Sequence, residues 1–144
     1  MASSFHDDYK STILQGVMKY NATGTRIYNA SNALIIAADP WICLLDLATL
    51  WTSAINASTD EVTGGSYARQ QAVFASVAGG TTDNDSNIDF TVMPACTVYS
   101  VGICATTTEL TDDIIIGGDL TASKVVNAGD TFRIAAGDLD VTLT

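Results

Sequence analysis

The sequence predicts a mainly β protein, an antiparallel β-sandwich of jelly-roll-like or immunoglobulin-like type with one short N-terminal helix. Turn signals recur about every 8–12 residues along the second half of the chain, which is typical of all-β sandwiches and barrels. Of the 16 acidic residues, 14 are aspartate, and aspartate favours turns and caps whereas glutamate favours helices. The chain closes with short Thr-, Val- and Ile-rich segments joined by Asn-Ala-Gly-Asp and Gly-Asp turns. These features predict many short strands and little helix.

The single helix is expected near the N-terminus, over residues 8–20. Asp7 or Asp8 can cap it. Apolar side chains recur on one face of it, at Tyr9, Ile13, Val17 and Tyr20. This helix packs on the protein's own sheet, or residues 1–30 form an arm that grips a neighbouring subunit. For the second alternative we expect interface residues at Phe5, Tyr9 and Ile13.

The rest of the chain is expected to alternate between strands and polar loops. Its nearly continuous apolar segment, residues 41–50, predicts a strand with both faces covered. Polar, glycine-containing loops are expected at 53–66 and 79–87. The other segments rich in strand formers are residues 32–38, 67–78, 88–93, 97–104, 113–116, 124–126, 131–135 and 139–143.

Composition limits what kind of protein this chain can be. Its 144 residues suffice for one domain with an ordinary core, and we expect residues 31–144 to form that single domain. The formal net charge of −10 argues against nucleic-acid binding, which needs a basic patch. Charged residues make up 15% of the chain, against roughly 25% in typical soluble domains. We therefore expect part of the surface to be buried against partners.

Neither a membrane span nor a signal peptide is expected. Asp39, Pro40 and Asp46 interrupt the apolar run over residues 33–51, and the first ten residues lack an apolar core segment. The three cysteines lie in apolar surroundings and are predicted to be buried, reduced thiols of a protein assembled inside the cell. They are Cys43, Cys96 and Cys104.

No set of residues forms a catalytic or metal-binding motif, so we expect neither an enzyme nor a cofactor. The nearest approach is Asp83, Asp85 and Asn87, which have the spacing of a calcium loop. However, Ile88 and Pro94 stand where that loop needs glycine and glutamate. A solvated loop is the simpler interpretation, with weak cation binding as the alternative.

The segment EVTGGSYARQQAVF, residues 61–74, combines a turn with aromatic and basic residues. Gly64 and Gly65 permit a backbone with positive φ and hence a tight entry into the next strand. Arg69 is expected to pair with a local or a neighbouring carboxylate because the protein is acidic. We expect Tyr67 and Arg69, together with Trp51 in the preceding loop, to contribute to an interface.

This segment, together with two later ones, carries a family resemblance. The later ones are TVYSVGICA, residues 97–105, and DLTASKVVNAGDTFRIAAGDLDVTLT, residues 119–144. The combination of GGSYARQ with NAGDTFRIAAGDLDVTL resembles small virion structural proteins of tailed bacteriophages. Members are tail-fibre-like or head-associated, and the resemblance implies a structural protein without enzymatic activity.

The leading expectation is a capsid decoration or cement protein that stabilises the shell from outside. Its partners would be the major capsid protein and copies of itself in a homotrimer, assembled in the host bacterial cytoplasm. One alternative is a tail fibre, tail-tip or adaptor component that contacts tail proteins. A second alternative is a carbohydrate-binding module that uses an exposed Trp51 or Tyr67.

Overall fold

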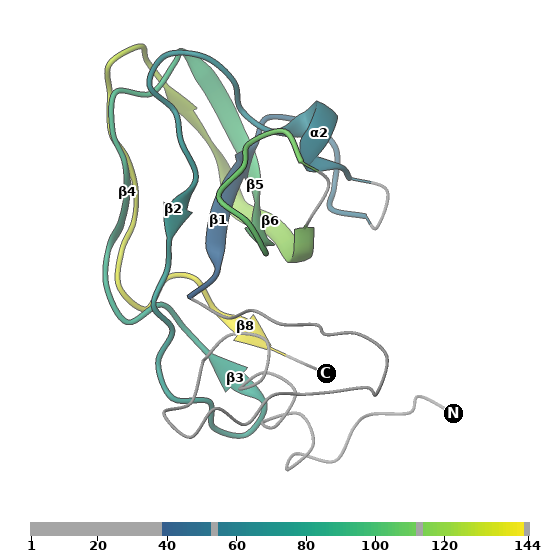
Figure 1. Ribbon diagram of the computed structural model, residues 1–144, viewed down its shortest axis with the longest axis vertical. Coiled ribbons are helices and arrows are strands. Elements are labelled where there is room, and N and C mark those ends of the chain that lie inside the picture. Colours follow the sequence, from purple (N-terminus) through teal and green to yellow (C-terminus); the bar gives the residue numbers. More distant parts are fainter. Residues whose placement is uncertain (1–38, 53–54, 112–113, 143–144) are drawn as a thin grey trace. The chain divides into compact units, whose positions relative to one another are not determined.

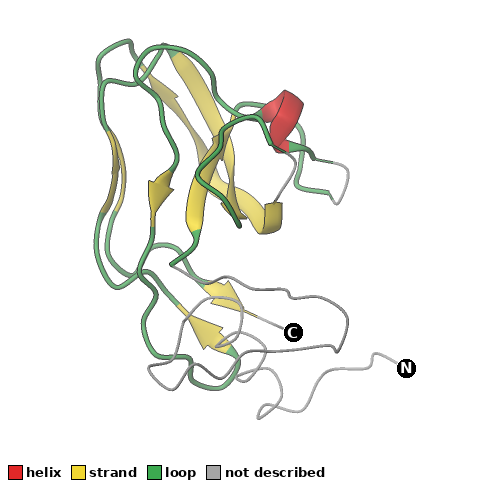
Figure 2. Cartoon of the chain, viewed as in Figure 1, coloured by secondary structure: helices red, strands yellow, loops and turns green. Residues whose placement is uncertain are grey.

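The computed structural model describes residues 39–52, 55–111 and 114–142 (Figures 1 and 2). The chain divides into two compact units. The larger unit consists of Pro40–Gln71 and Ile88–Ile134; the described part of the smaller unit consists of residues 72–87 and 135–142, with Asp39. The prediction of a mainly β protein with antiparallel sheets is confirmed.

Several expectations fall on residues outside this description. They are the helix over 8–20, the strand over 32–38, the boundary between residues 30 and 31, and the interface residues Phe5, Tyr9 and Ile13. Within the described residues, no helix has the length and apolar character needed to span a membrane.

A four-stranded antiparallel sheet forms the centre of the larger unit, in the order β2-β1-β5-β6. The strands are β1 (Trp41–Leu45), β2 (Gln70–Gln71), β5 (Cys96–Cys104) and β6 (Ile114–Val126). Strand β1 lies between β2 and β5, and its last four residues are buried. This confirms a strand covered on both faces, but it ends at Leu45 rather than at residue 50. The exposed Asp46 follows, and aspartate is disfavoured in strands.

Strand β6 differs from the expectation of two separate strands at 113–116 and 124–126. It runs without a break from Ile114 to Val126 and includes Gly117 and Gly118, which lie between the two expected strands. The glycines stay in the ladder because they lie opposite Gly102 and Val101 of β5. An irregularity follows, since Ser100 pairs with Asp119 whereas Val98 pairs with Lys124. The extra residues of β6 are accommodated there as a bulge.

A second ladder in the larger unit joins β4 (Ile88–Phe90) to β7 (Phe132–Ile134). Phe90 packs edge-to-face on Phe132 with ring centroids 6.1 Å apart. In the middle of the ladder, Asp89 and Arg133 lie opposite each other and form two hydrogen bonds of 2.6 and 2.8 Å. These bonds from Arg133 lower the pKa of the Asp89 carboxyl. Alternation of apolar and charged residues thus sets the inner and outer faces of this ladder.

The described part of the loop expected at residues 53–66 contains a short helix, α2 (Ala57–Asp60). Asn56 caps it, since its side chain accepts a hydrogen bond of 2.8 Å from the backbone N–H of Ser58. The helix buries only Ala57. It is therefore a turn-sized element that leads into Glu61.

In the described part of the smaller unit, a short antiparallel ladder joins β3 (Thr81–Thr82) to β8 (Val141–Thr142). The side chain of Asn84 is buried in this unit. It donates to the carbonyls of Ser86 and Ala135 and accepts from the N–H of Leu139, each at 2.8 Å.

The segment 67–78, expected as a strand, forms only β2 and isolated bridges. Its apolar residues do not alternate regularly, so they specify no long ladder.

Candidate functional site

The most deeply buried charges that the structure describes are Glu61 and Arg69, in the larger unit. Both side chains are inaccessible to solvent. The Nε and Nη2 atoms of Arg69 donate to Oε1 and Oε2 of Glu61, each at 2.9 Å. This is the bidentate geometry in which a guanidinium and a carboxylate match best. Of the two alternatives for Arg69, the structure therefore gives the local carboxylate.

Tyr67 completes this buried network. Its hydroxyl donates to Oε1 of Glu61 and accepts from the N–H of Leu44 in β1, both at 2.9 Å. Burial raises the pKa of Tyr67, so the phenol remains a proton donor to the carboxylate. Its ring is stacked on Phe90 at 6.0 Å between centroids. The network thus ties the segment after α2 to the central sheet and to β4.

The glycine pair of the motif sets the turn between Glu61 and Tyr67. Gly64 and Gly65 have φ values of 94° and 61°, a region that favours glycine. A Cβ on Gly65 would also lie 3.0 Å from the backbone nitrogen of Pro94. The expected positive φ is confirmed, and close backbone contact is a second reason for glycine at position 65.

The ion pair also holds the loop between β5 and β6. Arg69 donates to the carbonyls of Thr106 and Thr111 at 3.0 and 3.1 Å. Oε2 of Glu61 accepts from the N–H of Leu110 at 2.8 Å. Leu110 has a φ of 54° and its side chain is 46% exposed. The buried pair therefore fixes the path of this loop (residues 105–111), although the loop itself lies at the surface.

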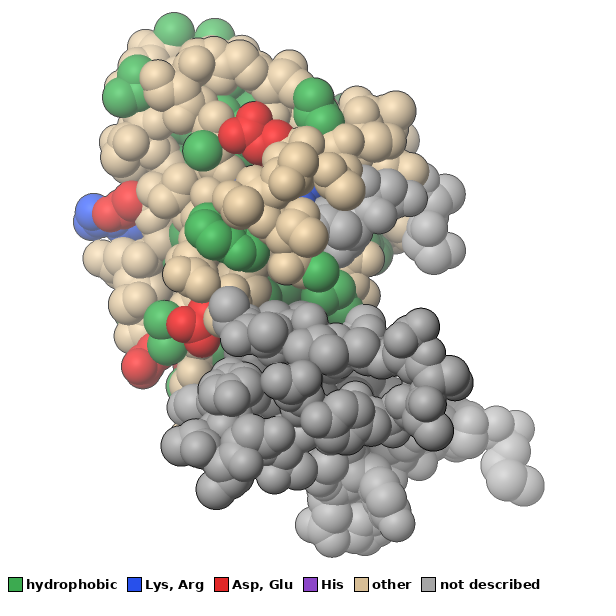
Figure 3. Space-filling view, viewed as in Figure 1, with side chains coloured by type: hydrophobic (Ala, Val, Ile, Leu, Met, Phe, Trp, Pro, Cys, Tyr) green, Lys and Arg blue, Asp and Glu red, His purple; other side chains and the backbone are tan. Residues whose placement is uncertain are grey.

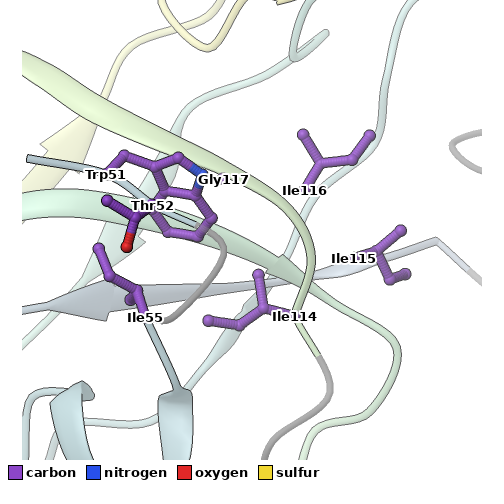
Figure 4. A pocket seen from close by; sticks show the side chains of 7 residues that line it. All are labelled: Trp51, Thr52, Ile55, Ile114, Ile115, Ile116 and Gly117. Atoms are coloured by element: carbon purple, nitrogen blue, oxygen red, sulfur yellow. The ribbon is translucent and has the colours of Figure 1, made fainter.

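A cavity of about 370 Å³ lies beside Trp51 and β6 in the larger unit (Figure 4). Its walls are Trp51, Thr52 and Ile55 on one side and residues 114–117 of β6 on the other. The N–H of Trp51 donates to both carboxylate oxygens of Asp119, at 2.9 and 3.0 Å. Figure 4 shows the indole ring lying against the strand at Gly117. Gly117 allows this contact because a Cβ there would overlap the ring.

The residues expected at an interface thus have different surroundings. Trp51 is half-buried at the cavity, whereas Tyr67 and Arg69 are only 6% and 2% exposed. Their side chains bind groups of their own chain, so Tyr67 cannot be the exposed ring that a carbohydrate platform requires. Sequence reasoning missed Glu61. The available signal was that Glu61 is one of only two glutamates and stands eight residues before Arg69 in the same motif.

On the face shown in Figure 3, the described residues carry few charged side chains. Asp83, Asp85 and Asn87, which have calcium-loop spacing, belong to the smaller unit. Asn87 uses its side-chain oxygen to accept from the N–H of Ala136 at 3.0 Å. Within residues 39–52, 55–111 and 114–142, no group of three His, Cys, Asp or Glu side chains could hold a metal ion.

One family model matches this chain, over residues 21–142, and its description is podophage GP4 fiber I protein gp80. The match includes the buried network, the cavity beside Trp51 and all described strands. No curated protein sequence matches the chain.

Replacing Glu61 by glutamine should destabilise the larger unit by about 3–5 kcal/mol, because it leaves the Arg69 guanidinium buried without a counter-charge. Urea unfolding followed by tryptophan fluorescence measures this change. Asp89→Asn is the matched control, since it neutralises the carboxylate of an exposed bidentate pair and should have a much smaller effect. Equal effects of the two substitutions would contradict the assigned importance of the buried pair.

Gly117→Ala should displace the Trp51 ring from β6 and lower the free energy of unfolding by about 1–3 kcal/mol, as overpacked sites do. The same variant should shift the tryptophan emission to longer wavelength. Gly118→Ala is the control, because a Cβ on Gly118 meets nothing within 4 Å. If both alanine variants kept the wild-type emission and stability, the contact between Trp51 and Gly117 would be disproved.

Proposed function

The chain belongs to the family described as podophage GP4 fiber I protein gp80 and is a structural component of a phage virion; we propose that it is part of the tail fibre. The main support for this proposal is that the family model matches residues 21–142, which is most of the chain. The family description names a fibre, which favours the tail alternative over the capsid decoration expected first. Low surface charge and many short strands suit either location, so they do not favour decoration.

We further propose that the protein acts without catalysis. The buried ionisable groups Glu61, Arg69 and Tyr67 are engaged with one another and with backbone groups. Such an arrangement fixes a conformation and leaves the buried Glu61 carboxylate unavailable as a general acid or base. The fibre description of the family supports the same interpretation.

The contacts of this protein in the particle are proposed to be with other copies of itself, as in a homotrimer, and with tail proteins. Apolar side chains that remain accessible in the larger unit provide candidate contact surface. They include Leu50, Val92, Leu110 and Val125, which are 80%, 53%, 46% and 70% exposed. Trp51 remains a candidate interface residue because it is half-buried beside a cavity.

Location and copy number on purified virions test the proposal. Antibody against the protein, detected with gold particles by electron microscopy, should label the tail. Gel densitometry against the major capsid protein should give a few copies per particle. Label over the whole head with hundreds of copies would instead establish decoration, and absence from the particle would overturn both locations. Particles made without the gene for this protein are the control for antibody specificity.

A further inference from the structure

Two buried thiols face each other across neighbouring strands of the larger unit. Cys43 in β1 and Cys104 in β5 are both fully buried, and the thiol of Cys104 donates to Sγ of Cys43 at 3.3 Å. Cys43 lies opposite Gly102, and Cys104 lies opposite Trp41. The two cysteines are therefore diagonal neighbours on one face of the sheet.

The local structure explains how the two sulfur atoms approach so closely. Gly102 leaves space opposite Cys43, since a Cβ there would lie 2.7 Å from the Cys43 sulfur. The pairing of β5 with β6 is irregular between Ile103 and Cys104, so the backbone of Cys104 is not held in a regular ladder on that side. The first feature lets the Cys43 sulfur lie close to that of Cys104, and the second leaves the backbone of Cys104 less constrained.

We propose that Cys43 and Cys104 form an intramolecular disulfide when the protein meets a low-molecular-weight disulfide oxidant. One cysteine thiolate attacks a sulfur of the oxidant and releases one thiol. The second cysteine then attacks the mixed disulfide and releases the second thiol. Two protein thiols are oxidised and one disulfide is reduced to two thiols. The sulfur atoms must move from 3.3 Å to about 2.05 Å apart.

This bond would link β1 to β5 covalently in the sheet. It would also close a loop of chain that contains the whole Glu61–Arg69 motif. Disulfides that close long loops stabilise mainly by restricting the unfolded chain. A virion passes from a reducing host interior to an oxidising exterior, so the bond would form after release. Oxidation of this pair does not depend on whether the protein lies in the tail or the head.

Cys96 provides an internal comparison. It lies at the other end of β5, opposite Val126, and is half-buried. Burial raises the pKa of its thiol, with a further contribution from Asp46. Because Cys96 lies at the opposite end of β5 from Cys104, it is expected to remain reduced or to take up a single oxidant molecule.

The test treats the purified full-length protein with oxidised glutathione, in buffer and in sub-denaturing urea that allows local opening. The protein is then denatured, alkylated and analysed by mass spectrometry. The expected product has lost two hydrogens and yields a Cys43–Cys104 linked peptide. Cys96→Ser should form the same link, and Cys104→Ser should not. The oxidised protein should melt roughly 5–15 °C higher than the reduced protein.

Two results would overturn the proposal. One is alkylation of both Cys43 and Cys104 after oxidation in buffer and in urea. The other is stable glutathione adducts on these cysteines without the linked peptide, which would mean that the two sulfur atoms cannot reach bonding geometry. A linked peptide accompanied by a lower melting temperature would confirm the bond but contradict its stabilising role.

Discussion

The ion pair between Glu61 and Arg69 is the interaction on which the larger unit most depends. Removing two charges from water costs several kcal/mol per ion, and their attraction offsets this only with good geometry and additional hydrogen bonds. The structure supplies both, because the pair is bidentate and is completed by Tyr67 and by backbone groups. An apolar replacement could fill the same space, but it could not hold the backbone groups of a surface loop in place.

The network therefore connects buried structure with exposed structure. Through the hydroxyl of Tyr67 it reaches the N–H of Leu44 in β1, and through Arg69 it reaches the carbonyls of Thr106 and Thr111. A loop held in this way does not need to lose conformational freedom when a partner binds. The left-handed backbone of Leu110, unfavourable for a residue with a side chain, is maintained by its bond to Glu61. For a structural phage protein, a fixed surface loop is suited to repeated, identical contacts.

Local patterns predicted part of this arrangement from the sequence. The apolar run at β1, the strand formers of β4 and β7, and the glycine turn before Tyr67 each depend on neighbouring residues. They were predicted because burial and backbone preference act locally there. Arg69 was expected to pair, but its partner was not identified, because the turn between them decides which carboxylate it meets.

The continuity of β6 and the environment of Trp51 could not be predicted in the same way. Gly117 and Gly118 look like a break in a strand, yet Gly117 lies in the ladder and accommodates a tryptophan from a segment more than sixty residues earlier. Such contacts depend on long-range packing that no local pattern encodes. The same holds for Cys43 and Cys104, whose proximity follows only from the pairing register of β1 and β5.

Hydrogen exchange at the Leu110 amide, followed by NMR, tests the importance of the buried pair most directly. Leu110 is an exposed loop residue, yet its N–H donates to the buried Glu61 carboxylate. We expect its exchange to be slow, comparable to that of amides in the centre of β5, while other amides of the same loop exchange quickly. Exchange at Leu110 as rapid as in an unstructured peptide would contradict the account, because the ion pair would then not hold the loop.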